Sequence, residues 1–539
     1  MAIIDVMNTS KAMRVGHGLA IVTLLLVGQV VLADPLSWVA GDGAWESVTN
    51  WSAGALPTAG DFVDIQHPGS VTSSAADNLA KEFVNKSALS VAAGKLAVTG
   101  TIDTFGAVSV QGGAILDAGR ITIETGGGFA VIGGGGSANV HVTEGVFNYG
   151  SWQMTGAAAL GAESFDNFNS IGIAGGATAS ANSMINHRDA TVSIKDAGSS
   201  LFIHGNLTND GAVFVDDQAQ FETHSIQNNA LIRVTNGMQT TESIINRGLG
   251  SQLQIRGASA HLDVSDVLTN ADLDGGSMLD VSDGASAHIE HLVNAGTVTI
   301  DGGHLLGRDL DNRGGLDVAG GSVALTGRVL NGALLSIDAT SSLSAERFQQ
   351  TALNLGTFVQ TYVRGGSLGA SGDFGVQVAV GELRGHGTID GKLTLTGSGL
   401  LAPDDAEASD VTGRFDVKAG LELLGGSFAV DLGGTSPGDY DLLDVDGAAT
   451  LGGTLKVALL DGFKPMLGDA FDIIFADSIA GAFGNILLPT LSDGLKFTTL
   501  NGGTFFRLQV AAVPLPAPAL LLGGALGVLG YSALRRRAA

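Results

Sequence analysis

The stretch Val293-Asn294-Ala295-Gly296-Thr297-Val298-Thr299-Ile300 decides the fold, because it joins a corner to a short strand. Asparagine and glycine are residues that tight turns accept readily, and the run that follows them is rich in β-branched residues, as strands are. The same order of residues recurs along the chain at a nearly constant interval. We therefore expect one repetitive β-structure rather than a set of unrelated domains.

The repeat is marked by an asparagine that returns every 18–24 residues, at positions 148, 167, 186, 209, 228, 246, 270, 294, 312, 331 and 354. A turn of about 20 residues with two or three short strands is one coil of a parallel β-helix, whose coils stack about 4.8 Å apart. Asparagines at one corner can then form a ladder of side-chain amides. The alternative is that asparagine and glycine only mark exposed turns. We predict a ladder that includes Asn209, Asn228, Asn246, Asn270, Asn294, Asn312 and Asn331.

Proline and glycine support the same fold. All ten prolines lie outside Gly69–Ala402, and proline cannot donate to a β-ladder. The 81 glycines argue against a helical array, because glycine destabilises helices. We predict an all-β, right-handed parallel β-helix (β-solenoid) with about 16 coils over this span, a rod roughly 80 Å long.

The charge and the lack of cysteine exclude several classes of protein. The chain has 53 acidic and 27 basic residues and a formal net charge of −26. Such a chain repels phosphate backbones, so we expect no nucleic-acid partner. Without cysteine it can form neither a disulfide nor a thiolate metal site.

The N-terminus has the features of a secretion signal. Lys11 and Arg14 precede a nearly apolar run from Leu19 to Leu32, and Ala33 is a small residue suited to cleavage. We predict a signal peptide over residues 1–33 and export of the rest. A short membrane anchor is the alternative, although the apolar run is short for one.

The C-terminus consists of a proline motif, an apolar stretch and a basic end. Residues Val513, Pro514, Leu515 and Pro516 precede 18 uncharged residues, Ala517–Leu534, which as a helix would span about 27 Å. Arg535, Arg536 and Arg537 follow, and the positive-inside rule then leaves the bulk of the chain outside the cytoplasm. Residues 511–539 resemble the PEP-CTERM sorting signal of Gram-negative bacteria in its VPLPA variant. This resemblance implies an exosortase-type protease as partner, transient membrane insertion, and a final place at the cell surface, outer membrane or extracellular matrix. A permanent tail anchor is the alternative.

Two segments flank the predicted coils of residues 76–382. Residues 34–75 hold Trp38, Trp45 and Trp51, which we expect to plug the open end of the β-helix as an N-terminal cap. An exposed row of these rings that stacks on sugars is the alternative. Residues 383–510, with Leu383–Gly391, Leu401–Asp404 and Gly438–Gly447, resemble the closing part of autotransporter passenger domains, which implies a C-terminal β-rich cap.

Motifs of catalysis or metal binding are weak in this sequence, and we predict no catalytic residue and no metal. Gly365-Gly366-Ser367-Leu368-Gly369 matches a nucleophile elbow, but no helix pattern follows it. His288 and His291 would point to opposite faces of a strand and cannot share zinc. A weak calcium candidate comprises Asp439, Asp441, Asp444 and Asp446, although their spacing does not fit an EF-hand.

These features predict an exported, non-enzymatic structural or adhesive protein that presents an acidic surface to exopolysaccharide, to neighbouring cells or to itself. A role in the extracellular matrix or biofilm is what the sorting-signal resemblance implies. The alternative is a polysaccharide-degrading lyase or hydrolase on a parallel β-helix. Such an enzyme needs a loop-walled groove with convergent Asp, Glu or Arg, for which turns of 18–24 residues leave little room.

Overall fold

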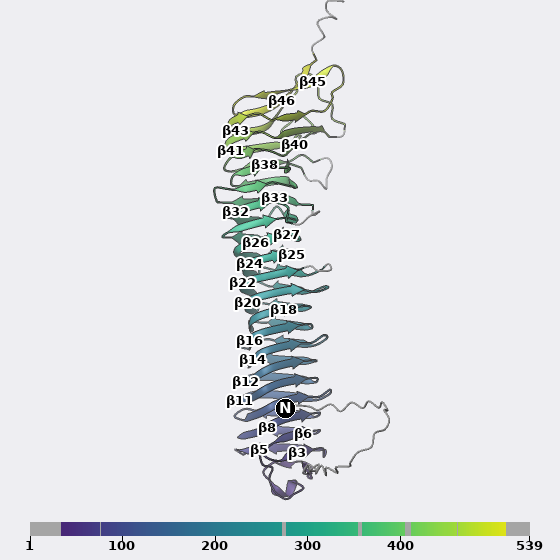
Figure 1. The fold of residues 1–539 in the computed structure, drawn as a ribbon, viewed down its shortest axis with the longest axis vertical. Coiled ribbons are helices and arrows are strands. Elements are labelled where there is room, and N and C mark those ends of the chain that lie inside the picture. The colour runs from purple at the N-terminus through teal and green to yellow at the C-terminus, as the bar shows by residue number, and fades with distance from the viewer. Residues whose placement is uncertain are drawn as a thin grey trace, which may run out of the picture.

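The computed structural model describes residues 34–513 except 76, 272–275, 354–357, 405–410 and 461. These residues form an all-β parallel solenoid of about 16 turns, with a single 3₁₀ helix of three residues, Val48–Asn50. The strands stack across the long axis of a rod from the N-terminal to the C-terminal end (Figure 1). The predicted parallel β-solenoid is confirmed.

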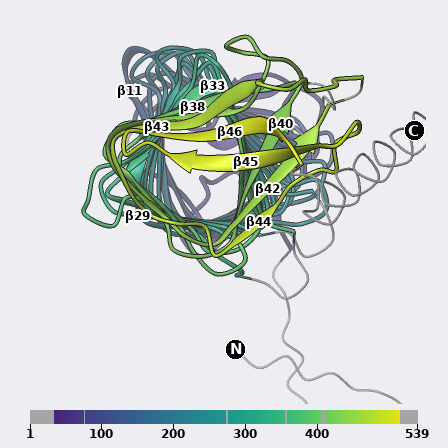
Figure 2. The same ribbon diagram turned by 90° about the horizontal axis from the view of Figure 1, so that it is seen from above.

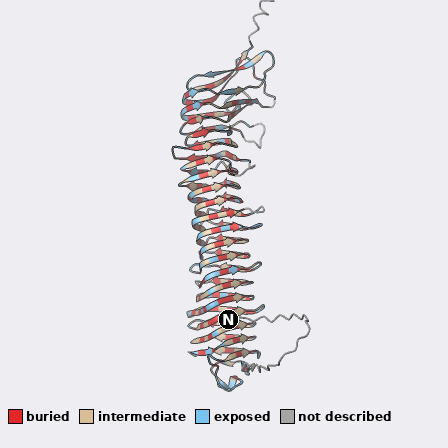
Figure 3. Cartoon of the chain, in the orientation of Figure 1, coloured by how far each residue is buried: buried red, intermediate tan, exposed pale blue. Residues whose placement is uncertain are grey.

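Alternation along each strand builds the interior. In β25 (Thr297–Asp301), Val298 and Ile300 are fully buried, whereas the residues between and beside them face outward. Successive side chains of a strand point to opposite faces, so each short β-branched run gives one apolar inner face and one polar outer face. Figure 3 shows the resulting alternation of buried and exposed residues along the whole rod.

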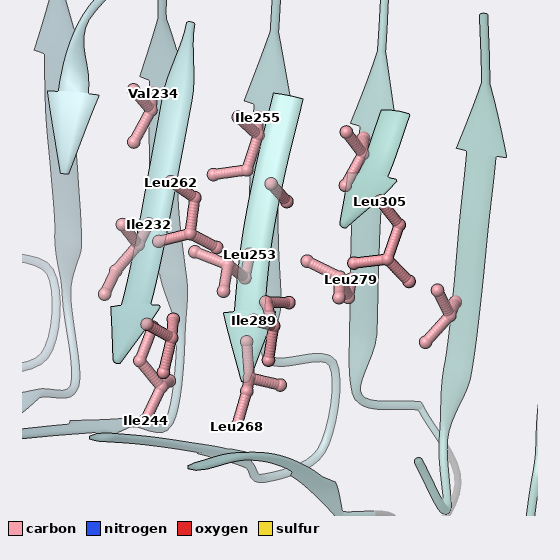
Figure 4. Packing of buried hydrophobic residues seen from close by; sticks show 14 of the residues in the cluster. Ile232, Val234, Ile244, Leu253, Ile255, Leu262, Leu268, Leu279, Ile289 and Leu305 are labelled. Atoms are coloured by element: carbon pink, nitrogen blue, oxygen red, sulfur yellow. The ribbon is translucent and has the colours of Figure 1, made fainter. Parts of the chain in front are cut away.

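The turns are held in register by parallel pairing. Strand β19 (Leu231–Thr235) pairs with β21 (Gln252–Arg256), which places Ile232 beside Leu253 and Val234 beside Ile255. Figure 4 shows these side chains packed between neighbouring turns. Because the strands of successive turns pair in register, apolar side chains stack on apolar side chains of the next turn and form one continuous core.

Close stacking also explains some of the glycines. The long strands β11 (Gly128–Asn148) and β12 (Ser151–Asn167) bend where they turn a corner, and the pairing shifts there. At that corner Gly156 has φ 67°, and a Cβ on it would lie 2.1 Å from the carbonyl oxygen of Gly133. Only glycine fits this position, because both the backbone angle and the contact exclude a side chain.

At the N-terminal end the three tryptophans form a buried cluster. The exposed fractions of Trp38, Trp45 and Trp51 are 3%, 0% and 2%. The ring centroid of Trp51 lies 5.1 Å from that of Trp38 and 4.8 Å from that of Trp45, in edge-to-face contacts. The alternative of an exposed row that stacks on sugars is therefore wrong, because no broad ring face reaches the surface.

At the C-terminal end the parallel order changes. Strand β46 (Phe505–Ala512) pairs antiparallel with both β43 (Ala470–Gly481) and β45 (Leu495–Asn501). Seen along the rod, β45 and β46 cross the mouth of the coil (Figure 2). Phe497 of β45 and Leu508 of β46 are buried.

Several predicted features lie outside the described residues: the signal segment with Ala33, the tail residues Pro514, Leu515 and Pro516, and Arg535, Arg536 and Arg537. Val513, the last described residue, is 48% exposed. Across residues 34–513, with the gaps given above, no helix has the length and apolar character needed to cross a membrane.

Candidate functional site

The most extended polar feature of the rod is a column of buried asparagines at one corner. Each side chain is at most 1% exposed, and the Nδ2 of each except the last donates to the Oδ1 of the asparagine one turn later at 2.8–2.9 Å. The predicted ladder is present, and its members are Asn148, Asn167, Asn186, Asn209, Asn228, Asn246, Asn270, Asn294, Asn312 and Asn331.

The second proton of each amide is also used. Asn294, the last residue of β24 (Ser286–Asn294), donates from Nδ2 to the carbonyl oxygen of Gly315 at 2.8 Å, and Asn270 donates to that of Thr297 at 3.0 Å. These carbonyls begin the next strand of the following turn. A buried amide is costly unless it is hydrogen-bonded, and here the Nδ2 of each corner asparagine finds acceptors in the stack.

The two ends of the ladder differ. On the turn that precedes Asn148, the corner position is held by Ile123, which offers no hydrogen bond, and the Oδ1 of Asn148 has no hydrogen-bond partner. Above it, Asn331 donates to the Oγ1 of Thr361 at 3.0 Å, and that hydroxyl donates to the Oε1 of Gln350 at 2.6 Å. Gln350 is in register with Asn331 and takes the next corner position; Asn354, the next asparagine of the sequence repeat, lies outside the described residues.

The second polar feature is a group of charged side chains around Arg384, which joins the later turns to the C-terminal region. Arg384 in β35 (Glu382–Asp390) donates from Nε to the Oε2 of Glu382 at 2.7 Å and from Nη1 to the Oδ1 of Asp404 at 2.5 Å. Burial alone would lower the pKa of Arg384, but these two carboxylates outweigh it and raise that pKa. The guanidinium is therefore a permanent cation between two acids.

Asp441 is the most deeply buried carboxyl beside this pair. Its side chain is fully buried, its Oδ1 accepts from the backbone N–H of Gly413, and its Oδ2 accepts from that of Asp431, both at 2.8 Å. Burial raises the pKa of Asp441 to about 8, although the two N–H donors oppose the shift, and the nearby acids Asp431 and Asp404 raise it further. Burial and Asp404 also raise the pKa of Asp431.

The four aspartates of the calcium candidate are not brought together. Asp439 accepts from the backbone N–H of Ser436 at 3.2 Å, while Asp441 is occupied as described. Asp444 and Asp446 form ion pairs with Arg414 and Lys418, at 2.5 and 3.2 Å. The calcium candidate is wrong, because each carboxylate has a different partner; within the described part of the chain no three His, Asp or Glu side chains converge on a possible ion.

The other motifs also have structural roles. Nδ1 of His288 lies 3.1 Å from Asp263 on the preceding turn, and Nδ1 of His291 lies 3.3 Å from Asp309 on the following turn. Ser367 lies inside β33 (Gln360–Ala370), between Ser342 and Thr388 of adjacent strands. No strand-to-helix turn exposes its hydroxyl.

The outer surface has several hollows that are lined by residues of neighbouring turns. One, of about 650 Å³, is lined by Asp373, Asp390, Lys392 and Lys418. Both lysines are paired with carboxylates, Lys392 with Glu422 at 2.9 Å and Lys418 with Asp446.

No family model and no curated protein matches this chain in comparisons with known proteins.

Proposed function

We propose that this chain is an exported, non-enzymatic structural or adhesive protein of the cell surface or extracellular matrix. The observation that carries this proposal is the unbroken corner ladder inside an apolar core. These interactions are internal, so neighbouring turns stabilise one another and the outside is left to present repeated polar strands. A stiff rod that displays one surface over many turns suits a spacer or an adhesive better than a single binding pocket.

The ends of the rod are proposed to be caps on a right-handed coil. An open β-solenoid exposes strand edges and apolar core, which would pair with other chains. The buried Trp38, Trp45 and Trp51 support an N-terminal cap, and the crossing of β45 and β46 supports a C-terminal one. Such caps let a long rod stay a single particle while its sides remain available.

The outer surface is proposed to bind exopolysaccharide. Without residues 1–33, of net charge +1, and without the tail from Val513, of net charge +3, the formal charge is −26 − 1 − 3 = −30. This charge keeps rods apart and soluble, and it would hold divalent cations loosely between the rod and acidic polymers.

The two ends of the sequence are proposed to direct the rod to its place. A signal peptide over residues 1–33 would start export, and the tail would hold the protein in the membrane until an exosortase-type protease acts at Val513, Pro514, Leu515 and Pro516. Export and sorting would thus place an acidic, non-enzymatic rod outside the cell.

The test is the location and mass of the mature protein in its own cells. We expect wild-type protein at the surface or in the matrix, with a mass that lacks residues 1–33 and the tail.

Replacement of Pro514 and Pro516 by alanine should leave a full-length, membrane-bound form, because the motif no longer stays extended in the protease. Replacement of Arg535, Arg536 and Arg537 by glutamate should leave unprocessed or misinserted precursor. Wild-type protein that keeps Ala539 at the surface would contradict the sorting step and indicate a permanent anchor.

A polysaccharide-degrading enzyme is the second candidate, and one observation favours it. Arg384, Asp404, Asp431 and Asp441 lie close together, and a cluster of carboxylates around an arginine is what such an enzyme needs. Purified protein should be incubated with neutral and acidic polysaccharides, and new reducing ends and unsaturated products should be measured. Turnover that is lost in Asp431→Asn, with the fold retained by circular dichroism, would replace the structural proposal.

A further inference from the structure

The loop between β42 (Thr454–Leu459) and β43 projects two large apolar side chains into solvent. Met466 is 70% exposed and Leu467 is 64% exposed, in a molecule whose other apolar side chains are mostly inside. We propose that this Met466–Leu467 tip contacts the outer lipid surface of the membrane that holds the tail. The inference rests on the membrane step of the proposed function.

The tip is fixed in place rather than loosely attached. The N–H of Met466 donates to the Oδ2 of Asp469 at 2.7 Å, and the N–H of Asp469 donates to the carbonyl oxygen of Met466 at 3.1 Å. Gly468 donates to the carbonyl oxygen of Val510 at 3.0 Å, and Val510 donates to that of Asp469 at 2.8 Å. The loop is therefore bound to the last strand, β46, directly before the chain reaches the tail.

The sequence then limits how far this loop can lie from a bilayer. The last described residue, Val513, donates to the carbonyl oxygen of Gly494 at 2.7 Å and is thereby held on the same end of the rod. The apolar stretch of the tail begins at Ala517, four residues later. Four extended residues reach at most about 14 Å. When the tail is inserted, the end that carries the tip lies about this close to the lipid.

The charges around the tip suit a headgroup layer. Lys464, on the same loop, and Lys496, in register with Ala511 of β46, are exposed. The acids nearby are Asp469, whose Oδ2 accepts from the N–H of Met466, and the exposed Asp493 on the turn next to Gly494. Two cations beside two apolar side chains fit an anionic lipid surface, which attracts basic groups and accepts apolar tips. The acidic sides of the rod would be repelled from the same surface.

The absence of cysteine makes a direct test simple. We would introduce Met466→Cys in the full chain, attach an environment-sensitive nitrobenzoxadiazole probe, and reconstitute the protein in vesicles of phosphatidylcholine and phosphatidylglycerol, with and without nitroxide-labelled lipid. The matched control is Leu249→Cys, because Leu249 is an exposed apolar residue (81%) on a surface turn. It lies roughly ten turns, or about 50 Å, from the C-terminal end.

We expect protein that floats with the vesicles to show a blue-shifted, lipid-quenched probe at position 466 and an unquenched probe at position 249. Equal, weak quenching at both positions would overturn the inference while leaving membrane insertion intact. Equal, strong quenching would mean that the rod lies along the bilayer and is not seated by its end. A blue shift at position 466 without lipid quenching would assign the tip to a second copy or to the tail. Protein that does not float would instead refute the membrane step of the proposed function, and the inference with it.

Discussion

At the scale of single residues, the corner asparagine is suited to its place because it offers two donors and an acceptor from a short side chain. One N–H binds the amide of the next turn and the other binds a backbone carbonyl, as at Asn294. Glutamine at the same corner works only with a different arrangement: the Nε2 of Gln350 donates to the carbonyls of Val380 and Glu382. The corner therefore selects for amides and tolerates few other groups.

Replacement of Asn294 by alanine should lower the free energy of unfolding by about 1–3 kcal/mol, because the Nδ2 of Asn270 and the carbonyl of Gly315 lose their partner inside the stack. The effect should couple to substitutions of Asn270 and Asn312 in double-mutant cycles of denaturant unfolding. Additive effects near zero would mean that the amides contribute nothing as a ladder.

Gln239 is a buried glutamine whose side-chain amide makes no hydrogen bond. It is fully buried, in register with Phe221 and Leu262, and neither polar atom of its side chain has a hydrogen-bond partner. Gln239→Leu should therefore raise the free energy of unfolding by about 1–3 kcal/mol. The matched control is Gln350→Leu, which removes satisfied bonds and should destabilise the protein. Equal effects of the two substitutions would contradict this account.

At the scale of elements, turns of unequal length keep one register because longer loops between the strands, and bulges within them, take up the additional residues. Between β20 (Met238–Arg247) and β22 (His261–Ala271) the pairing shifts after Thr241, where β22 holds an extra residue, yet Asn246 and Asn270 still meet. The spacing of asparagines predicts this meeting. It does not predict which side of the corner bulges, since that depends on contacts with the turns above and below.

Asp441 ties three elements together, which makes the C-terminal region sensitive to pH. Its carboxyl accepts backbone N–H groups from Gly413, before β38 (Arg414–Val417), and from Asp431 in β40 (Ser427–Leu432), and it precedes β41 (Leu442–Leu451). A carboxyl whose pKa is raised to about 8 in the folded state stabilises the fold at low pH and loses that contribution as pH rises through 8. We expect lower resistance to urea at pH 9 than at pH 6.

The control for this pH effect is Asp441→Asn, which loses one hydrogen bond but cannot ionise beside Asp431 and Asp404. Its stability should be lower than that of the wild type at pH 6, yet it should change less between pH 6 and 9. A variant with the same pH dependence as the wild type would assign the effect to other groups.

At the scale of the whole molecule, the sequence predicts the class of fold well because the solenoid repeats one local rule. An asparagine, a glycine and a β-branched run specify the coils between Asn148 and Asn331, and each coil supplies the same environment to the next. The two ends do not follow this repeat, so their details were harder to predict. The burial of Trp38, Trp45 and Trp51 and the antiparallel pairing of β45 depend on contacts between segments that the repeat does not describe. Two corner residues were missed: Thr104, whose Oγ1 accepts from the Nδ2 of Asn85 and which is in register with Ile123, and Gln350, whose Oε1 accepts from the hydroxyl of Thr361. Neither is an asparagine, so the spacing of asparagines could not identify them.

Scattering checks the overall shape. Purified residues 34–513 should give a β-dominated circular dichroism spectrum and a pair-distance distribution that extends beyond about 80 Å. A compact globular chain of this length would have a radius of gyration of about 23 Å and a symmetric distribution. That compact profile, or appreciable helix, would contradict the solenoid.

The corner ladder also gives the rod an electrical direction. Every asparagine of the corner ladder, from Asn148 to Asn331, donates towards the C-terminal end, so the dipoles of these ladder amides add and none cancels another. The carbonyl that takes the second proton, such as that of Leu231 beside Asn209, fixes this sense, because a reversed amide would set oxygen against oxygen. The side-chain column is thus positive towards its C-terminal end and negative at Asn148. Two rods lying side by side would attract through these dipoles when antiparallel and repel when parallel, so the interior of one rod would bias the direction of its neighbour.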